Sequence, residues 1–264
     1  MLWERTIKIA LPASAALSLL TASAFAADIG PEMPVKGPPL PAPFTWSGCY
    51  AGVAASGGIG QTGISDTHRL RAPGLSDTFD ISGYTLGGQI GCDYQFAANQ
   101  FAPNWVLGIE GGAAGGNVGG TTTFSLTGLP GDTATFKENT DLLTSITGRV
   151  GYAWDRWLLY AKGGAAWAGN RYTALDTITI YNFQGSETRF GWTAGGGIEW
   201  ALWNDWSLRL EYDYYGFGTK SITFINTINS NTGPENISQN IQVIKLGVNF
   251  HVPASAAPFV PLDW

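Results

Sequence analysis

The sequence predicts an all-β fold, an eight-stranded antiparallel β-barrel that spans a membrane with short turns at one end and four long loops at the other. Three observations support this prediction: the composition, the alternation of apolar and polar residues, and the lengths of the connections. Glycine supplies 36 of 264 residues, and charged residues make up only 13%, against a usual share of about a quarter. No stretch after residue 26 has the roughly 18 consecutive apolar residues of a membrane helix, so only a β-barrel could cross a membrane.

Residues 1–26 have the pattern of a secretory signal peptide. Arg5 and Lys8 precede an apolar run over residues 9–20, and small residues flank Phe25 at a cleavage site that ends at Ala26. Cleavage removes two of the 14 basic and one of the 20 acidic residues, which leaves 12 minus 19, a net charge of −7. This acidic balance argues against nucleic acid as a partner. A retained membrane helix is the alternative, although the apolar run is short for one.

Residues 27–46 are expected to form a Pro-rich periplasmic linker. Six prolines between positions 31 and 43 disfavour helix and sheet and favour an extended polyproline II conformation. We favour an inert tether over a docking segment. The barrel is expected over residues 47–251, followed by a C-terminal tail over residues 252–264.

Eight segments have the alternation of a two-faced strand. The pattern is clearest from Trp206 to Tyr214, where every second residue is apolar and the residues between are Ser, Arg, Glu and Asp. An edge strand of an extracellular sandwich is the alternative for this stretch. The expected strands cover residues 47–60, 81–96, 105–117, 138–154, 157–171, 188–201, 206–218 and 238–251.

The connections between these segments alternate in length. Residues 97–104, 155–156 and 202–205 form short connections, whereas residues 61–80, 118–137, 172–187 and 219–237 form long ones rich in Gly, Thr, Ser, Asn and Asp. An even number of strands with short turns on one side and long polar loops on the other is typical of a bacterial outer-membrane barrel. The short turns would then be periplasmic and the long loops extracellular.

Tryptophan residues cluster at the ends of the expected strands. Eight residues separate Trp192 from Trp200, about 27 Å along a strand and about 20 Å along the membrane normal after tilting. That distance is close to the height of the apolar band of such a barrel, whose two interfaces select aromatic residues. The sequence therefore predicts an aromatic girdle made of Trp46, Trp105, Trp154, Trp157, Trp167, Trp192, Trp200, Trp203 and Trp206.

The opposite face of each strand is expected to point into the barrel. Its charged residues, four positive and five negative, are Asp93, Glu110, Arg149, Lys162, Glu199, Arg209, Glu211, Asp213 and Lys245. Isolated buried charge is costly, so these groups are expected to pair. An eight-stranded barrel is only wide enough for side chains to fill it. We expect a salt-bridged plug and not a wide pore; a catalytic carboxylate cluster is the disfavoured alternative.

Cys49 and Cys92 are candidates for a disulfide. A hairpin that is symmetric about the loop over residues 61–80 places them opposite each other on adjacent strands, near the end that carries the short turns. The exported compartment is oxidising, so a bond there is plausible. A register error of one or two residues would separate them.

Other motifs support no activity. Gly58–Gly63 matches the dinucleotide pattern Gly-x-Gly-x-x-Gly, but it closes a strand into a loop and no helix follows. His68 and His251 are too few and too far apart for an ordinary metal site. An acyltransferase that uses His68 with Asp66 and Ser76 is a remote hypothesis, because loop histidines are usually solvated. No cofactor and no metal are expected.

Several stretches resemble a known family. They are Phe44-Thr45-Trp46-Ser47-Gly48-Cys49-Tyr50-Ala51-Gly52, Tyr160-Ala161-Lys162-Gly163-Gly164, Trp206-Ser207-Leu208-Arg209-Leu210-Glu211-Tyr212 and Lys245-Leu246-Gly247-Val248-Asn249-Phe250. With the exported N-terminus, they resemble the small eight-stranded outer-membrane proteins of alphaproteobacteria, in the OmpA-like porin superfamily. Cys49 stands where that family usually has an aromatic residue.

The resemblance implies a structural or surface protein, not an enzyme, that supports envelope integrity in the outer membrane. The implied partners are outer-membrane lipid and lipopolysaccharide, the barrel-assembly machinery and an unknown extracellular partner. Such barrels usually end on an aromatic residue read by that machinery, a role open to Phe250 or Trp264. The alternatives are a narrow diffusion porin, and an adhesin or ligand-binding protein whose loop residues such as His68, Arg69, Arg71 and Asp77 contact a partner.

Overall fold

The computed structural model describes residues 44–65, 76–97, 101–125, 133–176, 182–203, 205–226 and 232–253. The expected signal peptide, most of the linker, the tail from residue 254, and the loop residues Asp66, His68, Arg69 and Arg71 lie outside these residues, as does the side chain of Asp77. Among the described residues there is no helix of the length and apolarity that crossing a membrane requires.

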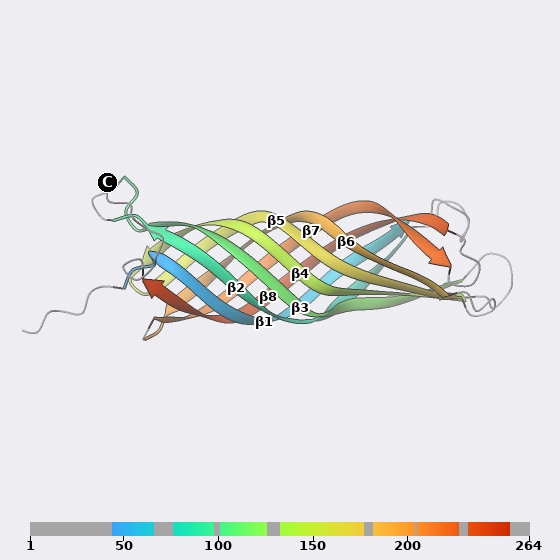
Figure 1. The fold of residues 1–264 in the computed structure, drawn as a ribbon, viewed down its shortest axis with the longest axis horizontal. Coiled ribbons are helices and arrows are strands. Elements are labelled where there is room, and N and C mark those ends of the chain that lie inside the picture. The colour runs from blue at the N-terminus through green and yellow to red at the C-terminus, as the bar shows by residue number, and fades with distance from the viewer. Residues whose placement is uncertain are drawn as a thin grey trace, which may run out of the picture. The chain divides into compact units, whose positions relative to one another are not determined.

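Eight antiparallel strands form a closed barrel, which confirms the predicted fold class (Figure 1). Each strand pairs with its neighbours in the sequence, and β1 pairs with β8 to close the sheet. The strands are β1 (Gly48–Ser65), β2 (Ser76–Gln95), β3 (Trp105–Ser125), β4 (Thr133–Trp154), β5 (Trp157–Asp176), β6 (Asn182–Ala201), β7 (Trp206–Asn226) and β8 (Thr232–Pro253).

The strands begin and end near the expected positions at the short turns but run further at the other end. β1 continues to Ser65 and β3 to Ser125, so much of what the sequence suggested as long loops is strand. Gly58–Gly63 therefore lies inside β1 and does not close it into a loop. At the C-terminus β8 includes Val252 and Pro253, so the expected tail begins two residues later than predicted.

The three short turns each contain a residue in the left-handed backbone region. These residues are Asn104 (φ 66°), Asp155 (φ 51°) and Asp205 (φ 65°). Asn and Asp tolerate this conformation better than other non-glycine residues, because their side chains can hydrogen-bond locally. These residues lie in the three connections that the sequence predicted to be short.

Alternating side chains point outward and inward along each strand. On β8 the outward Ile244 is 60% exposed and Leu246 55%, whereas the inward Asn249 is fully buried. On β7 the outward Leu210 and Tyr212 are exposed, and the inward Glu211 is 1% exposed. Apolar residues outside and polar residues inside are the reverse of a water-soluble domain and suit a surface covered by lipid.

A bulge in β4 reverses this alternation. Between the bulge and the short turn, odd-numbered residues such as Arg149 point inward. Between the bulge and the long loop, the even-numbered Glu138 and Thr140 point inward instead. The register of β4 against β5 shifts between Thr140 and Leu142, so Asp141 is the extra residue. Asp141 lies on the outer face, where its carboxylate pairs with Arg171 at 2.7 Å.

Candidate functional site in the barrel interior

The nine charged residues predicted for the interior all point inward and form one connected network. Arg149 is its centre at the turn end, with Nη2 at 3.0 Å from Asp93 and 3.2 Å from Glu199. Nη1 of Arg149 also donates to the Tyr50 hydroxyl at 2.9 Å, and that hydroxyl donates to Glu110 at 2.7 Å. Tyr50 thus joins two parts of the network.

Lys162 is the second centre of the network. Its Nζ lies 2.9 Å from Glu110, 2.7 Å from Glu211 and 3.3 Å from Asp213. Arg209 pairs with Glu110 and lies 3.7 Å from Glu211, and Lys245 pairs with Glu211 at 3.2 Å and with Asp213. Each cation thereby meets at least two carboxylates.

Burial makes this network costly to disturb. The side chains of Arg149 and Glu199 are fully buried, and that of Lys162 is 1% exposed. Removing one partner of a buried ion pair typically costs about 3–5 kcal/mol, because the other charge remains desolvated. The network therefore favours one arrangement of the interior and leaves little room for mobile ions.

Polar residues outside the predicted set of nine charges complete the turn end of the network. Glu199 accepts hydrogen bonds from Ser207 and, at 2.7 Å, from Asn249. His251 Nε2 lies 3.2 Å from Glu199 and 2.9 Å from the Ser207 hydroxyl. These residues have the inward parity of their strands, and the structure buries all of them.

Trp46 is not part of the aromatic girdle, in contrast to the prediction. Its side chain is 1% exposed and packs inside the mouth of the barrel. It belongs to one apolar cluster with Val106, Ala153, Leu158, Tyr160, Ala201 and Phe44. Its backbone N–H donates to Gln95 Oε1 at 2.9 Å. Phe44 and Trp46, which lie in the stretch that the sequence analysis assigned to the linker, therefore form an apolar cap over the turn end of the barrel.

Gly48 lets the chain turn into the mouth. Its φ of 147° lies in a region that L side chains rarely adopt, whereas glycine adopts it readily. Next to it, the Ser47 hydroxyl accepts a hydrogen bond from the Gln95 N–H at 2.9 Å. The turn at Gly48 and the contacts with Gln95 explain why Trp46 caps the interior and does not reach the outer rim.

The loop half of the interior is mainly apolar, with a smaller number of buried polar side chains among the apolar ones, so the charge network fills only part of the barrel. One cluster of buried side chains fills this half: Ile64, Phe79, Ile81, Val118, Phe136, Leu143, Ala166, Ala168, Tyr172, Tyr215, Phe217, Ile237, Ile241 and Val243. The expected salt-bridged plug therefore occupies the turn half of the interior, and this mainly apolar cluster fills the rest. The interior is nonetheless filled along the described strands.

Two further buried charges lie at the loop end and were missed. Glu138 accepts a hydrogen bond from Gln239 at 2.7 Å, and Gln239 in turn accepts one from Asn170 at 2.8 Å. Arg189 is fully buried on β6. The bulge in β4 hides Glu138 from a parity rule, whereas Arg189 has the inward parity of β6 and could have been found.

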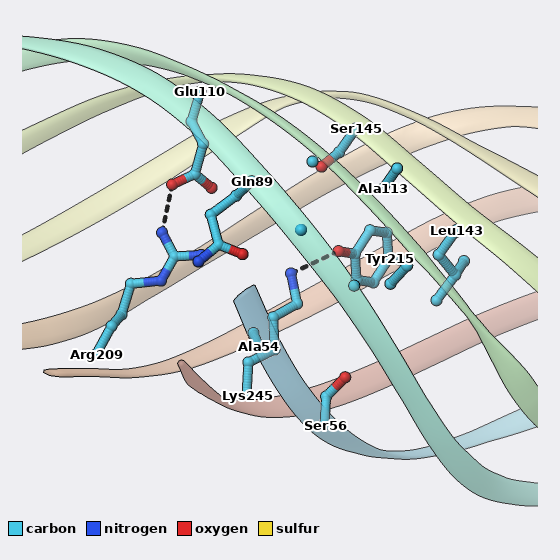
Figure 2. A pocket seen from close by; sticks show the side chains of 14 residues that line it. Ala54, Ser56, Gln89, Glu110, Ala113, Leu143, Ser145, Arg209, Tyr215 and Lys245 are labelled. Atoms are coloured by element: carbon cyan, nitrogen blue, oxygen red, sulfur yellow. Dashed lines mark hydrogen bonds and ion pairs between the residues drawn. The ribbon is translucent and has the colours of Figure 1, made fainter. Parts of the chain in front are cut away.

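A small cavity of about 30 Å³ separates the charge network from the apolar half. Figure 2 shows Arg209 and Glu110 on one side of it and Lys245 with Tyr215 on the other. Its volume suits about two water molecules, since one needs roughly 10–15 Å³ on this measure. The cavity is too small for an organic substrate.

The remaining girdle residues lie on the outer face or in a turn. Trp157 stacks on Trp200 with ring centroids 5.4 Å apart, and Trp206 meets Phe250 edge to face at 5.3 Å. At the other end Trp192 lies 5.3 Å from Tyr214. Trp105, Trp154 and Trp203 are exposed at the turn end, and Trp167 is partly exposed at the loop end.

Cys49 and Cys92 are directly opposite each other in the β1–β2 register and form a disulfide. Cys92 is exposed on the outer face of the barrel, while the neighbouring Tyr50 points inward. The bond therefore ties the outer face of the first hairpin close to the cap residue Trp46. Among the described residues, no group of three or more His, Cys, Asp or Glu side chains could hold a metal ion.

A closed antiparallel barrel with an apolar outer face and a buried ionic interior defines an integral membrane β-barrel protein. The chain belongs to the Outer membrane protein beta-barrel domain family, whose sequence model matches residues 13–251. Its location is therefore the outer membrane.

Relatives and solved structures are similar to this chain. The 31 kDa outer-membrane immunogenic protein of Brucella melitensis is 28% identical over 88% of this chain and 95% of that protein. The 22 kDa outer membrane protein of Rhizobium leguminosarum is 29% identical over 83% and 82%. The outer membrane protein OprG from Pseudomonas aeruginosa has 12% identity and a TM-score of 0.37 over 78% of this chain and 97% of that one. The family and the two relatives confirm the resemblance that the sequence suggested.

Proposed function

We propose that this outer-membrane protein is a structural barrel that supports the envelope and does not conduct ions. The observation that carries the proposal is the filled interior: the Trp46 cap, the ion-pair network around Arg149 and Lys162, and the apolar cluster around Phe136 follow one another along the barrel. An eight-stranded barrel has no spare width once such side chains fill it. A narrow diffusion porin would require these layers to rearrange together.

Single-channel recording in planar bilayers tests this proposal. The full exported chain, folded into neutral lipid, is expected to give no steady conductance above the bare bilayer, whereas a known porin in the same chamber gives its usual steps. A large, steady conductance from the monomer would refute the proposal, because ions would then have a continuous path past the cap and the network.

We also propose a surface-display role, in which the loops contact a partner outside the cell. Two relatives from Brucella carry the word immunogenic in their names, which supports exposure of such proteins. β5 continues nine residues beyond Trp167 to Asp176, or about 30 Å along the strand and about 20 Å along the normal. Strands of this length would raise the loops well clear of the lipid.

Replacement of residues 66–75 by a Gly-Ser linker tests the display role. Loss of attachment to a host or surface receptor with unchanged envelope permeability would support it, and unchanged attachment after all four loops are replaced would exclude it.

Phe250 is our candidate for the aromatic signal read by the assembly machinery, because its ring is on the outer face near the end of β8.

We expect no catalytic activity from this interior. Ser207, His251 and Glu199 lie within hydrogen-bonding distance of one another, but Ser207 and Glu199 both meet the same nitrogen, Nε2 of His251. A hydrolytic triad needs the acid on the other ring nitrogen, so that one nitrogen is free to take the serine proton. The three side chains are also buried below the cap.

A further inference from the structure

The barrel wall is interrupted between β6 and β7. The two strands pair continuously from Ala201↔Ser207 to Trp192↔Gly216 and again at Gln184↔Ile225 and Phe183↔Asn226. No pairing joins residues 185–191 of β6 to β7 across the described strands. We call this stretch, with residues 217–224 of β7 opposite, the β6–β7 gap. The register shifts of β3–β4, β4–β5 and β7–β8 span at most two residues.

A bulge in β7 explains where the gap begins. Gly218 has φ of 61° and the register of β7 against β8 shifts between Gly216 and Gly218, so Phe217 is an extra residue that points inward. A side chain at Gly191 would begin 2.3 Å from the Gly216 carbonyl oxygen. The two backbones thus touch at Gly191 and lose their ladder immediately above it.

Arg189 is buried at this gap with unused hydrogen-bond donors. Its side chain is 1% exposed, and its Nη2 donates to the Ile237 carbonyl oxygen. Among the described residues, Nε and Nη1 have no hydrogen-bond partner. A desolvated guanidinium with two free donors is costly unless an acceptor meets it. Nε and Nη1 lie on different edges of the guanidinium, and each can donate a charge-assisted hydrogen bond to a carboxylate or phosphate oxygen.

The carboxylate of Glu187 lies between Arg189 and a second cation across the gap. Its Oε1 pairs with Lys220 of β7, and its Oε2 lies 4.0 Å from Nε of Arg189, beyond hydrogen-bonding distance. Lys220 is half exposed and Glu187 is largely buried. Glu138, the other buried carboxylate at this end, is bound by Gln239. Glu138 also interacts electrostatically with Arg189. Among the described residues, however, no carboxylate oxygen hydrogen-bonds Nε or Nη1 of Arg189.

The surroundings of the gap fit an amphiphile. Phe190 and Trp192, on the outer face of β6 beside the lower end of the gap, are 67% and 54% exposed. Aromatic residues mark the depth at which lipid headgroups lie. An acyl chain could follow the aromatic side chains while a charged headgroup reaches Arg189.

We propose that the β6–β7 gap binds the anionic headgroup of an amphiphile, a phosphate held by Arg189 and Lys220, with Glu187 as the internal anion that the headgroup displaces. The proposal deepens the expected contact with outer-leaflet lipid and is independent of whether the barrel conducts. The same phosphate chemistry could come from a lipid headgroup or from free phosphate, so both are tested.

Titration of the folded full chain in neutral maltoside micelles with dodecyl phosphate tests the site. Affinity comes from calorimetry, and the Arg189 Nε–H resonance reports the contact directly. Arg189→Met is expected to weaken binding at least tenfold, because charge-assisted hydrogen bonds are lost. Lys220→Gln is expected to weaken it severalfold, and Glu187→Gln to strengthen it severalfold. Arg171→Gln is the matched control: this exposed cation on β5 is already paired with Asp141, and binding should not change.

The outcomes separate the explanations. Unchanged binding by a folded Arg189→Met barrel, judged by its heat-modifiable mobility on a gel, would overturn the proposal. If that variant does not fold, unchanged affinity in both Lys220→Gln and Glu187→Gln would overturn it. Inorganic phosphate that binds as tightly as dodecyl phosphate would assign the site to a free anion, and much weaker binding would assign it to a lipid headgroup. Neither result bears on conductance.

Discussion

Replacement of Lys162 by methionine tests whether the ion-pair network is dry. Lys162 Nζ lies 2.7–3.3 Å from three carboxylates, and its side chain is 1% exposed. Methionine is similar in length and carries no charge, so the change leaves Glu110, Glu211 and Asp213 with one cation fewer. For a buried pair the expected loss is about 3–5 kcal/mol of unfolding free energy. In a water-filled interior the same change would cost about 0–1 kcal/mol.

Urea unfolding of the barrel in lipid vesicles, followed by tryptophan fluorescence, measures this loss. Arg171→Met is the control, because Arg171 makes an ion pair of 2.7 Å with Asp141 but its side chain is 77% exposed; its expected loss is below about 1 kcal/mol. Adding Glu211→Gln to Lys162→Met should restore part of the stability, since it removes one uncompensated carboxylate. A loss below about 1 kcal/mol for Lys162→Met would refute the dry interior.

Three further predictions use the cap, the glycines and the disulfide. Trp46→Ala should destabilise the barrel by about 3–5 kcal/mol. It should also make a cysteine placed at Ala153, in the cap cluster, react faster with a charged thiol reagent. An unchanged labelling rate would exclude the cap. Gly148→Ala should leave the unfolding free energy in urea nearly unchanged, because its new methyl group meets no atom within 4 Å. Gly164→Ala should be strongly destabilising, because its methyl group would lie 2.1 Å from the Ile146 carbonyl oxygen. Equal effects of the two substitutions would contradict the strand register. Reduction of the Cys49–Cys92 bond should lower stability by up to about 4 kcal/mol on the chain-entropy model, measured by unfolding with and without reductant; no difference would contradict the bond.

The sequence predicted the fold class and the turn end of the barrel because those features are local. Alternation over Trp206–Tyr214 places Arg209, Glu211 and Asp213 on one face, and that rule needs no knowledge of neighbouring strands. The short connections over residues 155–156 and 202–205 follow from where the alternation stops and resumes. The nine interior charges follow from the same rule applied to each strand.

Features that depend on tertiary geometry were missed. The bulge at Asp141 carries no glycine or other residue-type signal, yet it moves Glu138 to the interior and Asp141 to the outer face. Trp46 resembles the girdle tryptophans in the sequence, since it also lies beside the end of a strand. What distinguishes it is the inward turn at Gly48, which depends on contacts with Gln95 on the neighbouring strand.

The loop halves of the strands were missed for a different physical reason: the hydrophobic order of the barrel reverses along its axis. Near the turns the outer face is apolar, as at Leu210 and Ile244, and the inner face is ionic. Near the loops the outer face carries exposed polar residues such as Lys137 and Arg171, whereas the inner face is apolar, as at Phe136. This upper part has the order of a water-soluble barrel, which is expected where strands rise above the lipid. Two opposite patterns in one strand weaken any single rule of alternation, so these polar outer residues suggested loops, whereas the structure shows strands.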